Sequence, residues 1–326
     1  MKKSIDYFEE FYRQYGSPMI HENFPEYEGR IAVGLVGEGS DCFGYDDEIS
    51  RDHDFGLGFC MWLHAADYAK IGEKLENLYR NLLAGKGEEF ARRIWGGEAA
   101  GYNPRFDSRR GVFEITRFYK NILRVPIDDE EELLIGENMY HAEERFLATA
   151  VNGRVFRDDD RAFSLARERL LKFYPEKQRR LKIAQSLHLF SHGGQSNYPR
   201  MMARKDYVAA RLALDLTIEN ALHLAYLLNK VYMPYYKWQR KGLNDLPKLR
   251  EIGPLLDALC VLNVQDKAWE NKTYNAVSLN MDDPVVALVE KIAEILLAEL
   301  NAQGIVKGSE TFLEIYAQAV ASGSET

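Results

Sequence analysis

The chain has 326 residues, 46% of them hydrophobic, and a formal net charge of −8. A chain of this length and apolar content can bury one large core or two moderate ones, and two domains are the usual outcome. The negative charge argues against binding to long nucleic acid, because such binding depends on the neutralisation of many phosphates. No apolar run reaches membrane-spanning length and residues 1–6 lack the apolar stretch of a signal peptide, so we expect a cytoplasmic protein with no membrane partner.

The three cysteines, Cys42, Cys60 and Cys260, are an odd number without metal-binding spacing, which predicts reduced thiols. Charge is distributed unevenly along the chain. Residues 1–153 carry 18 Lys and Arg against 29 Asp and Glu, whereas residues 154–212 carry 14 against 6. The basic segment either binds an anionic partner next to an acidic metal site or only solvates one face of its helices.

The first predicted strand lies at residues 31–36, an apolar run that ends at Gly37. Glu38, Gly39 and Ser40 follow it. Glycine lets the backbone approach a phosphate without an intervening side chain, and exposed N–H groups and the Ser40 hydroxyl can donate to anionic oxygens. The sequence therefore predicts a phosphate site at Gly39 and Ser40.

Two aspartates, Asp52 and Asp54, follow this turn after a loop of eleven residues. In an extended segment alternate residues point to the same face, so both carboxylates would project together. Adjacent carboxylates repel each other unless a divalent cation lies between them, and oxygen ligands favour magnesium or manganese. Arg51 is expected either to contact a phosphate or to pair with a neighbouring carboxylate. The acidic residues of the loop are expected to be solvated: Asp41, Asp46, Asp47 and Glu48.

The Gly-Ser pair, the loop and the Asp-x-Asp pattern together resemble the signature of the polymerase-β-type nucleotidyltransferase superfamily. The resemblance implies a third metal-binding carboxylate from a later strand with apolar neighbours. Glu114, in a predicted strand at residues 112–116, has that form and is the first candidate. Asp107 is the second candidate, because its neighbours are typical of a loop.

Helices are predicted at residues 65–83 and 139–150, followed by a turn and a short extended piece at 152–158. The last segment resembles the Gly-x-Val-x-x-Asp element that commonly closes the catalytic domain of this superfamily. The expected fold is therefore α+β, with a small mixed-sheet nucleotidyltransferase-like domain at residues 1–155 and an all-α, substrate-binding bundle at 156–326. The predicted helices of the bundle lie at residues 160–172, 175–192, 200–230, 254–264, 283–303 and 308–321, with a break at 193–197.

The segment at residues 227–238 is rich in aromatic and basic side chains. Pro234 should interrupt a helix there, and Lys237 lies beside Tyr235 and Trp238, which places a phosphate donor next to a stacking surface. Together with the Gly-Ser pair and residues 50–53, this segment resembles a bacterial family classed as nucleotidyltransferases of undefined substrate. We expect Asn229, Tyr235 and Lys237 to contact the substrate; the alternative is that the segment forms a packing seam between the domains.

These features predict a metal-dependent nucleotidyltransferase that moves a nucleoside monophosphate, AMP from ATP, to a hydroxyl of an unidentified acceptor. Asp52, Asp54 and Glu114 would hold Mg²⁺ or Mn²⁺, and Gly39 and Ser40 would bind the β- and γ-phosphates. Resemblance to aminoglycoside adenylyltransferases implies a small polyhydroxylated acceptor and leaves a homodimer open. The alternatives are a non-catalytic nucleotide-binding or toxin-neutralising module and a metal phosphohydrolase built on the His53-Asp54 dipeptide.

Overall fold

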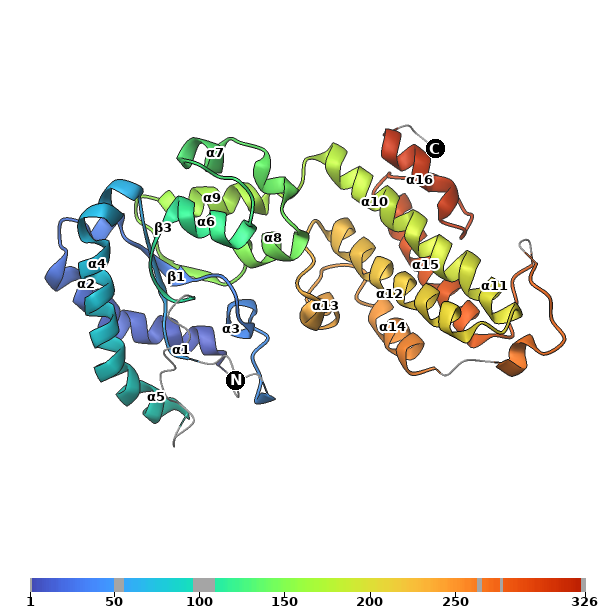
Figure 1. Ribbon diagram of the computed structural model, residues 1–326, viewed down its shortest axis with the longest axis horizontal. Coiled ribbons are helices and arrows are strands. Elements are labelled where there is room, and N and C mark those ends of the chain that lie inside the picture. The colour runs from blue at the N-terminus through green and yellow to red at the C-terminus, as the bar shows by residue number, and fades with distance from the viewer. Residues whose placement is uncertain (1, 50–55, 96–108, 263–265, 276–277, 324–326) are drawn as a thin grey trace. The chain divides into compact units, whose positions relative to one another are not determined.

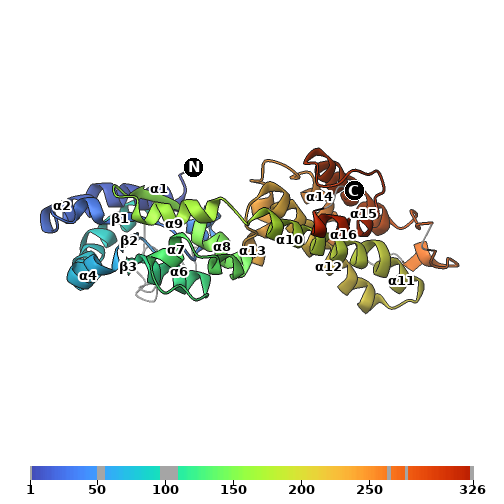
Figure 2. The same ribbon diagram turned by 90° about the horizontal axis from the view of Figure 1, so that it is seen from above.

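The computed structural model describes residues 2–49, 56–95, 109–262, 266–275 and 278–323 (Figures 1 and 2). Its contacts divide the chain into two compact units, Met1–Lys172 and Phe173–Thr326. The first unit holds a small mixed sheet and its covering helices, and the described part of the second unit contains helices and their connections but no strand. These features confirm the predicted α+β class with a helical second part. No helix within the described ranges is long and apolar enough to cross a membrane.

The sheet has four short strands: β1 Ala32–Leu35, β2 Cys60–Leu63, β3 Gly111–Glu114 and β4 Arg154–Arg157. Their order is β3-β2-β1-β4. β1 runs antiparallel to β2 and β4, whereas β2 and β3 are parallel. The backbone that leaves β1 therefore emerges at the end of the sheet where β2 and β3 begin, and this geometry decides which predicted site residues can meet.

The two faces of the sheet bury different side chains because residues alternate along a strand. Met61 and Leu63 of β2 belong to a core with Phe8 and Leu75. Trp62 points to the other face, where its ring stacks on Phe163 at a centroid distance of 3.8 Å. The helices of the first unit are α1 Ser4–Phe11, α2 Ser17–Asn23, α3 Ser40–Phe43, α4 Ala65–Leu82, α5 Glu88–Trp95, α6 Ile115–Leu123, α7 Glu130–Leu134, α8 Glu144–Val151 and α9 Ala162–Leu171.

The first unit extends beyond the boundary predicted at residue 155 and ends at Lys172. Two contacts account for this extension. β4 pairs with β1 along the sheet, and Phe163 of α9 packs against Trp62 of β2. Both contacts join residues about 100 positions apart, which is why local pattern placed the boundary too early.

The second unit contains α10 Glu176–Phe190, α11 Tyr198–Ala203, α12 Tyr207–Asn229, α13 Tyr236–Leu243, α14 Ile252–Val261, α15 Pro284–Ala302 and α16 Glu314–Ser322. The predicted helix at 283–303 is confirmed by α15. α12 ends at Asn229, where Lys230 adopts a left-handed backbone with φ 54°, so the helix stops before Pro234 is reached. The last predicted helix begins later than residue 308, at Glu314.

The predicted break at residues 193–197 is wrong. Ser191–Asn197 forms a π-helical segment that connects α10 to α11 without a loop. The glycines serve close packing against α12: a Cβ atom on Gly193 would lie 2.5 Å from Thr217 Oγ1 and 2.6 Å from the Ala213 carbonyl oxygen. The two glycines predicted a break between helices because their contact with α12 is not visible in the local sequence.

We expect Gly193→Ala to destabilise the protein by about 1–3 kcal/mol, the usual cost of overpacking a close contact. Gly85→Ala is the matched control, because Gly85 also lies in a π-helical segment, Leu83–Gly87, but a Cβ there meets nothing within 4 Å. Urea unfolding of the two variants measures the difference. Equal free energies of unfolding for the two variants would show that the π-helical segment and α12 can move apart to accommodate the added methyl group.

Candidate functional site

The glycine turn, residues 37–40, leaves the end of β1. Gly37 and Gly39 both have φ of 127°, a backbone conformation that residues with a Cβ rarely adopt. The Gly37 N–H donates to Asn152 Oδ1 at 2.9 Å, and Asn152 Nδ2 donates to the Gly37 carbonyl at 2.7 Å. One asparagine side chain, just before β4, therefore holds the start of the turn in place. Sequence reasoning did not select Asn152, since its partner is 115 positions away.

A buried ion pair between Asp41 and Arg110 lies next to the glycine turn. Arg110 Nη2 donates to Asp41 Oδ2 at 2.8 Å, and the two side chains are 10% and 3% exposed. Asp41 Oδ1 also accepts the Cys42 N–H at 2.8 Å. Burial lowers the pKa of Arg110, but the charge of Asp41, the neighbouring Cys42 and Cys60 and the hydrogen bond to Asp41 together raise it above its ordinary value, so the guanidinium stays ionised. The prediction that Asp41 lines a solvated loop is therefore wrong.

Arg110 connects three segments of the chain. It precedes β3, it pairs with Asp41 behind the glycine turn, and its Cγ would lie 3.4 Å from a Cβ built on Gly58, just before β2. A Cβ on Gly39 would likewise lie 3.5 Å from Arg110 Nη2. The glycine turn and the approaches to β2 and β3 thus meet around one arginine, which the sequence analysis missed.

Two thiols are buried close to this pair. Cys60 Sγ lies 3.4 Å from the Arg109 carbonyl oxygen, and Cys42 Sγ lies 3.6 Å from the Glu38 carbonyl oxygen. Burial raises the pKa of Cys60 to about 11, and burial also raises the pKa of Cys42. Both side chains therefore act as neutral packing groups, as reduced cysteines were expected to do.

The predicted ligands Asp52 and Asp54 lie outside the described residues, as do Arg51 and the second candidate Asp107. Among the residues that the structure does describe, no group of three or more His, Cys, Asp or Glu is arranged to hold a metal ion. Of the residues predicted to bind phosphate in the first unit, the structure therefore describes Gly39 and Ser40, which follow the end of β1.

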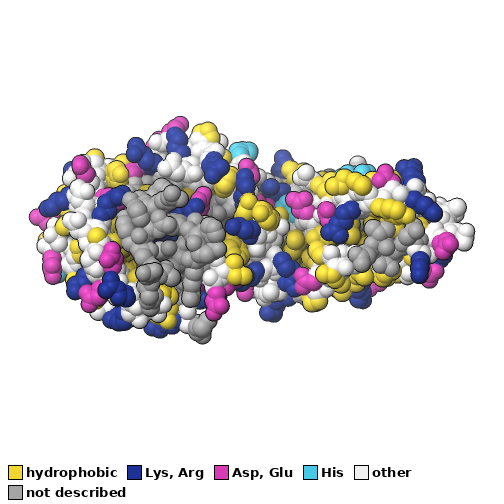
Figure 3. Space-filling view, turned by 60° about the horizontal axis from the view of Figure 1, so that its bottom comes forward, with side chains coloured by type: hydrophobic (Ala, Val, Ile, Leu, Met, Phe, Trp, Pro, Cys, Tyr) yellow, Lys and Arg dark blue, Asp and Glu magenta, His cyan; other side chains and the backbone are white. Residues whose placement is uncertain are grey.

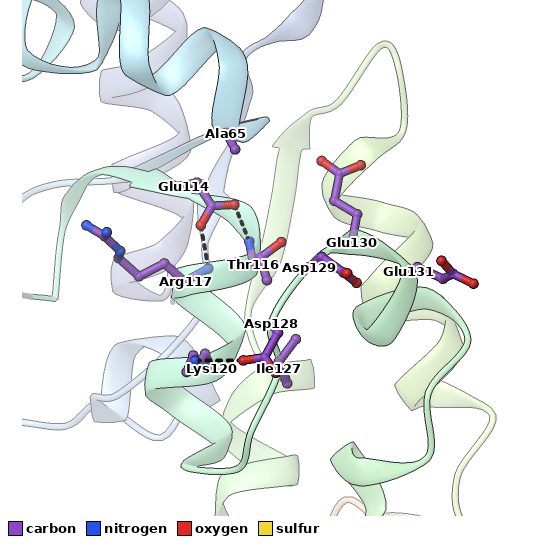
Figure 4. A pocket seen from close by; sticks show the side chains of 10 residues that line it. All are labelled: Ala65, Glu114, Thr116, Arg117, Lys120, Ile127, Asp128, Asp129, Glu130 and Glu131. Atoms are coloured by element: carbon purple, nitrogen blue, oxygen red, sulfur yellow. Dashed lines mark hydrogen bonds and ion pairs between the residues drawn. The ribbon is translucent and has the colours of Figure 1, made fainter.

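Glu114 lies at the other end of the sheet. It is the last residue of β3, and β3 is parallel to β2, so the strand leads away from the glycine turn. Its two carboxylate oxygens accept the N–H groups of Thr116 at 2.8 Å and Arg117 at 2.7 Å, which caps α6 (Figure 4). The structure does not bring Glu114 together with Gly39 and Ser40. The strand predicted around Glu114 is confirmed by β3, but this strand carries Glu114 to the end of the sheet opposite the glycine turn.

Glu114 instead borders a pocket of about 620 Å³ between α6 and α7. Figure 4 shows acidic side chains from residues 128–131 on one side of this pocket and Arg117 and Lys120 on the other. Lys120 Nζ pairs with Asp128 at 3.3 Å, and Glu130 pairs with His64. Glu114, Lys120, Asp128 and Glu130 therefore have partners within the first unit, and the pocket lies away from the glycine turn.

In the second unit, Asn229 has a structural role. Its side-chain amide donates to the Ala225 carbonyl at 2.8 Å and the Lys248 carbonyl at 3.0 Å, and its oxygen accepts the Lys248 N–H at 3.0 Å. Both N–H donors are therefore engaged. Asn229 ties the end of α12 to the chain near residue 248, which leaves no amide donor for a substrate.

Tyr235 and Lys237 are accessible at the start of α13. Tyr235 is 39% exposed and Tyr236 68% exposed, and their rings lie 4.4 Å apart between centroids. Lys237 is exposed one residue further on. Aromatic faces beside an ammonium group can receive a planar or polyhydroxylated ligand that carries a phosphate. Tyr235 and Lys237 are therefore exposed to solvent, whereas both amide donors of Asn229 are engaged within the second unit.

The excess of basic residues between 154 and 212 is partly neutralised within the first unit. On the face drawn in Figure 3, cationic and anionic side chains are interspersed rather than gathered by sign. Arg154 pairs with Asp6 and Glu9, Arg157 with Glu28 and Asp159, and Arg161 with Glu168. These pairs favour the solvated-face explanation of the basic segment.

One comparison with known proteins finds a similarity. Residues 140–239 match the family model described as Domain of unknown function (DUF4037). The matched stretch contains Asn152, β4 and the Tyr235–Lys237 surface, and it does not contain the glycine turn. No curated protein and no solved structure matches the chain. The chain is therefore similar to a family without an assigned activity over part of its length.

Proposed function

We propose that the protein is a metal-dependent nucleotidyltransferase that moves a nucleoside monophosphate, AMP from ATP, to a hydroxyl group. The direction of the strands is the observation that carries the proposal. The glycine turn emerges where β2 and β3 begin. Asp52 and Asp54 precede β2 in the chain and Asp107 precedes β3, and the end of the sheet at which these two strands begin is the end that holds Gly39 and Ser40.

The proposal assigns the third metal ligand to Asp107 in place of Glu114. Three aspartates supply hard oxygen donors, which suit Mg²⁺ or Mn²⁺. When bound there, the ion would neutralise charge on the triphosphate and lower the pKa of the acceptor hydroxyl. The backbone N–H groups of the glycine turn and the Ser40 hydroxyl would hold the β- and γ-phosphates, and Arg51 would add a cation beside them.

The remaining contacts support this arrangement. Asn152 holds Gly37, and the Asp41–Arg110 pair fixes the turn against the approaches to β2 and β3. A phosphate site needs such rigidity because its hydrogen-bond donors must point toward the phosphate position before the ligand binds. In the second unit, the exposed Tyr235 ring and Lys237 ammonium are proposed to bind the acceptor, a small polyhydroxylated molecule.

Calorimetric titration of each nucleoside triphosphate with magnesium tests the proposal. We expect the wild type to bind in a metal-dependent way, and Asp52→Asn and Asp54→Asn each to weaken binding by at least ~10-fold, because loss of a ligand costs no less than the 10–100-fold typical of outer-shell changes. Glu48→Gln is the matched control, since Glu48 is exposed in the same loop and should bind normally.

Failure of every triphosphate to bind in magnesium or manganese would refute the proposal. Phosphate release from mononucleotides without an acceptor would favour the phosphohydrolase alternative. Binding that is insensitive to Asp52 and Asp54 would favour a nucleotide-binding module without catalysis.

A further inference from the structure

The pocket between α6 and α7 has no role in the nucleotidyl transfer proposed above. Its volume of about 620 Å³ lies within the range of small-molecule sites. Three of its lining residues belong to α6, and five more, residues 127–131, lead into α7 or begin it. The described residues that line the pocket include five acids and two bases. Both walls therefore belong to the first unit, and acidic groups predominate on them.

A buried hydroxyl group faces this pocket. Thr116 lines the pocket although it is only 7% exposed. Figure 4 shows its hydroxyl oxygen directed across the pocket toward Asp129 and Glu130. A threonine within a helix often donates to the carbonyl four residues earlier, but Thr116 is the second residue of α6, and residue 112 belongs to β3. The hydroxyl has no hydrogen-bond partner among the described residues, so it is available to a ligand.

Asp129 carries a negative charge that no cation among the described residues neutralises. Its Oδ1 accepts the Glu132 N–H at 2.9 Å and caps α7, which leaves Oδ2 for a ligand. The two basic residues that line the pocket do not supply the missing charge. Lys120 pairs with Asp128 at 3.3 Å, and Figure 4 shows the Arg117 side chain extending away from Asp129.

The electrostatic field at the edge of the pocket favours positive charge. His64 Nδ1 pairs with Glu130, which lines the pocket, and His64 Nε2 lies 3.7 Å from Asp160. Burial lowers the pKa of His64, but the hydrogen bond and charge of Glu130 and the charges of Asp160 and Asp67 together raise it above its ordinary value. A cation is thus stabilised here by Glu130, a carboxylate that a bound ligand would also meet.

The arrangement of the acceptors selects the kind of cation. Within the described ranges, no group of three or more His, Cys, Asp or Glu is arranged to hold a metal ion. An ammonium group donates in three directions, so its N–H groups can reach separate oxygens, here Thr116 Oγ1 and Asp129 Oδ2. Ala65 and Ile127 line the same pocket and offer apolar surface to methylene groups. These features fit an aliphatic ammonium ion.

We propose that the pocket between α6 and α7 binds the ammonium group of a small aliphatic amine, with Thr116 Oγ1 and Asp129 Oδ2 as its acceptors. A second ammonium group on the ligand would gain from the excess of acidic residues around the pocket, so a diamine is the preferred ligand. The proposal is independent of the nucleotidyl-transfer assignment, because the pocket lies away from the glycine turn.

Calorimetric titration of the full chain with 1,4-diaminobutane tests the proposal, and 1,4-butanediol is the uncharged control ligand. The wild type should bind the diamine saturably and should not bind the diol. Thr116→Val should weaken diamine binding by about tenfold, because it removes one hydrogen bond to a charged group, whereas Thr116→Ser should bind within about threefold of the wild type. Thr116→Val should also fold normally, since the hydroxyl loses no partner among the described residues.

Asp129→Asn tests the charge without loss of the helix cap. Asparagine caps helices as well as aspartate does, so this variant should keep α7 and lose about tenfold in diamine affinity. Asp206→Asn is the matched control, because Asp206 is an exposed cap of α12 in the second unit and its loss should leave diamine affinity unchanged.

Diamine binding that is unchanged in Thr116→Val overturns the proposal, because the acids would then attract the amine only as a diffuse negative surface. The absence of saturable binding to the wild type also overturns it, as does equal binding of the diol. A loss of affinity in Asp206→Asn as large as that in Asp129→Asn would place the amine outside this pocket.

Discussion

Replacing Asp107 with asparagine should reduce the proposed nucleotidyl transfer by at least about 100-fold, whereas replacing Glu114 with glutamine should leave it nearly unchanged. The difference follows from strand direction. Asp107 precedes β3 in the chain, and β3 begins at the end of the sheet that holds the glycine turn, whereas Glu114 ends the same strand at the opposite end. Glu114 instead caps α6, so its loss should cost stability by about 1 kcal/mol.

Pyrophosphate release from ATP and Mn²⁺ affinity in the presence of nucleotide measure the two effects separately. The pair of variants is well matched, because each removes one negative charge and retains the shape of the side chain. Loss of metal affinity in Glu114→Gln with normal behaviour of Asp107→Asn would return the third ligand to Glu114. It would also contradict the placement of the site at the β2 and β3 starts.

The second large effect is expected at the Asp41–Arg110 pair. Asp41→Asn should destabilise the protein by about 3–5 kcal/mol, because it leaves a buried guanidinium without its counter-charge. The double variant Asp41→Asn with Arg110→Met should be more stable than Asp41→Asn, since no unpaired charge remains. Nucleotide affinity should nevertheless fall in both variants, because the link between the glycine turn and Gly58 is lost.

Arg154→Met is the control for this experiment. Arg154 also pairs with two carboxylates, Asp6 and Glu9, but it is 47% exposed, and exposed pairs contribute about 0–1 kcal/mol. Urea unfolding of the three variants compares the pairs directly. A cost for Asp41→Asn no greater than that for Arg154→Met would mean that water or a rearranged side chain compensates the Arg110 charge.

Local sequence was sufficient for features that arise from sterics and periodicity over a few residues. The apolar run at 31–36 became β1, the helical spacing after residue 65 became α4, and Gly37 and Gly39 adopt the backbone angles that suit a turn. The α+β class followed from the same signals, because strand-like runs occur only in the first half of the chain. These properties depend on neighbours within one helical turn or one strand.

Tertiary structure decided which residues share a site. The parallel pairing of β2 with β3 separates Glu114 from the glycine turn, and the ion pair of Asp41 with Arg110 joins segments 69 positions apart. Asn152, whose side chain holds Gly37, is 115 positions away from it. Gly193 and Gly194 pack closely against Thr217 of α12, which their sequence neighbours do not indicate. Such contacts depend on the order of the strands and on which helices cross. Neither can be read from the pattern of neighbouring residues in the sequence.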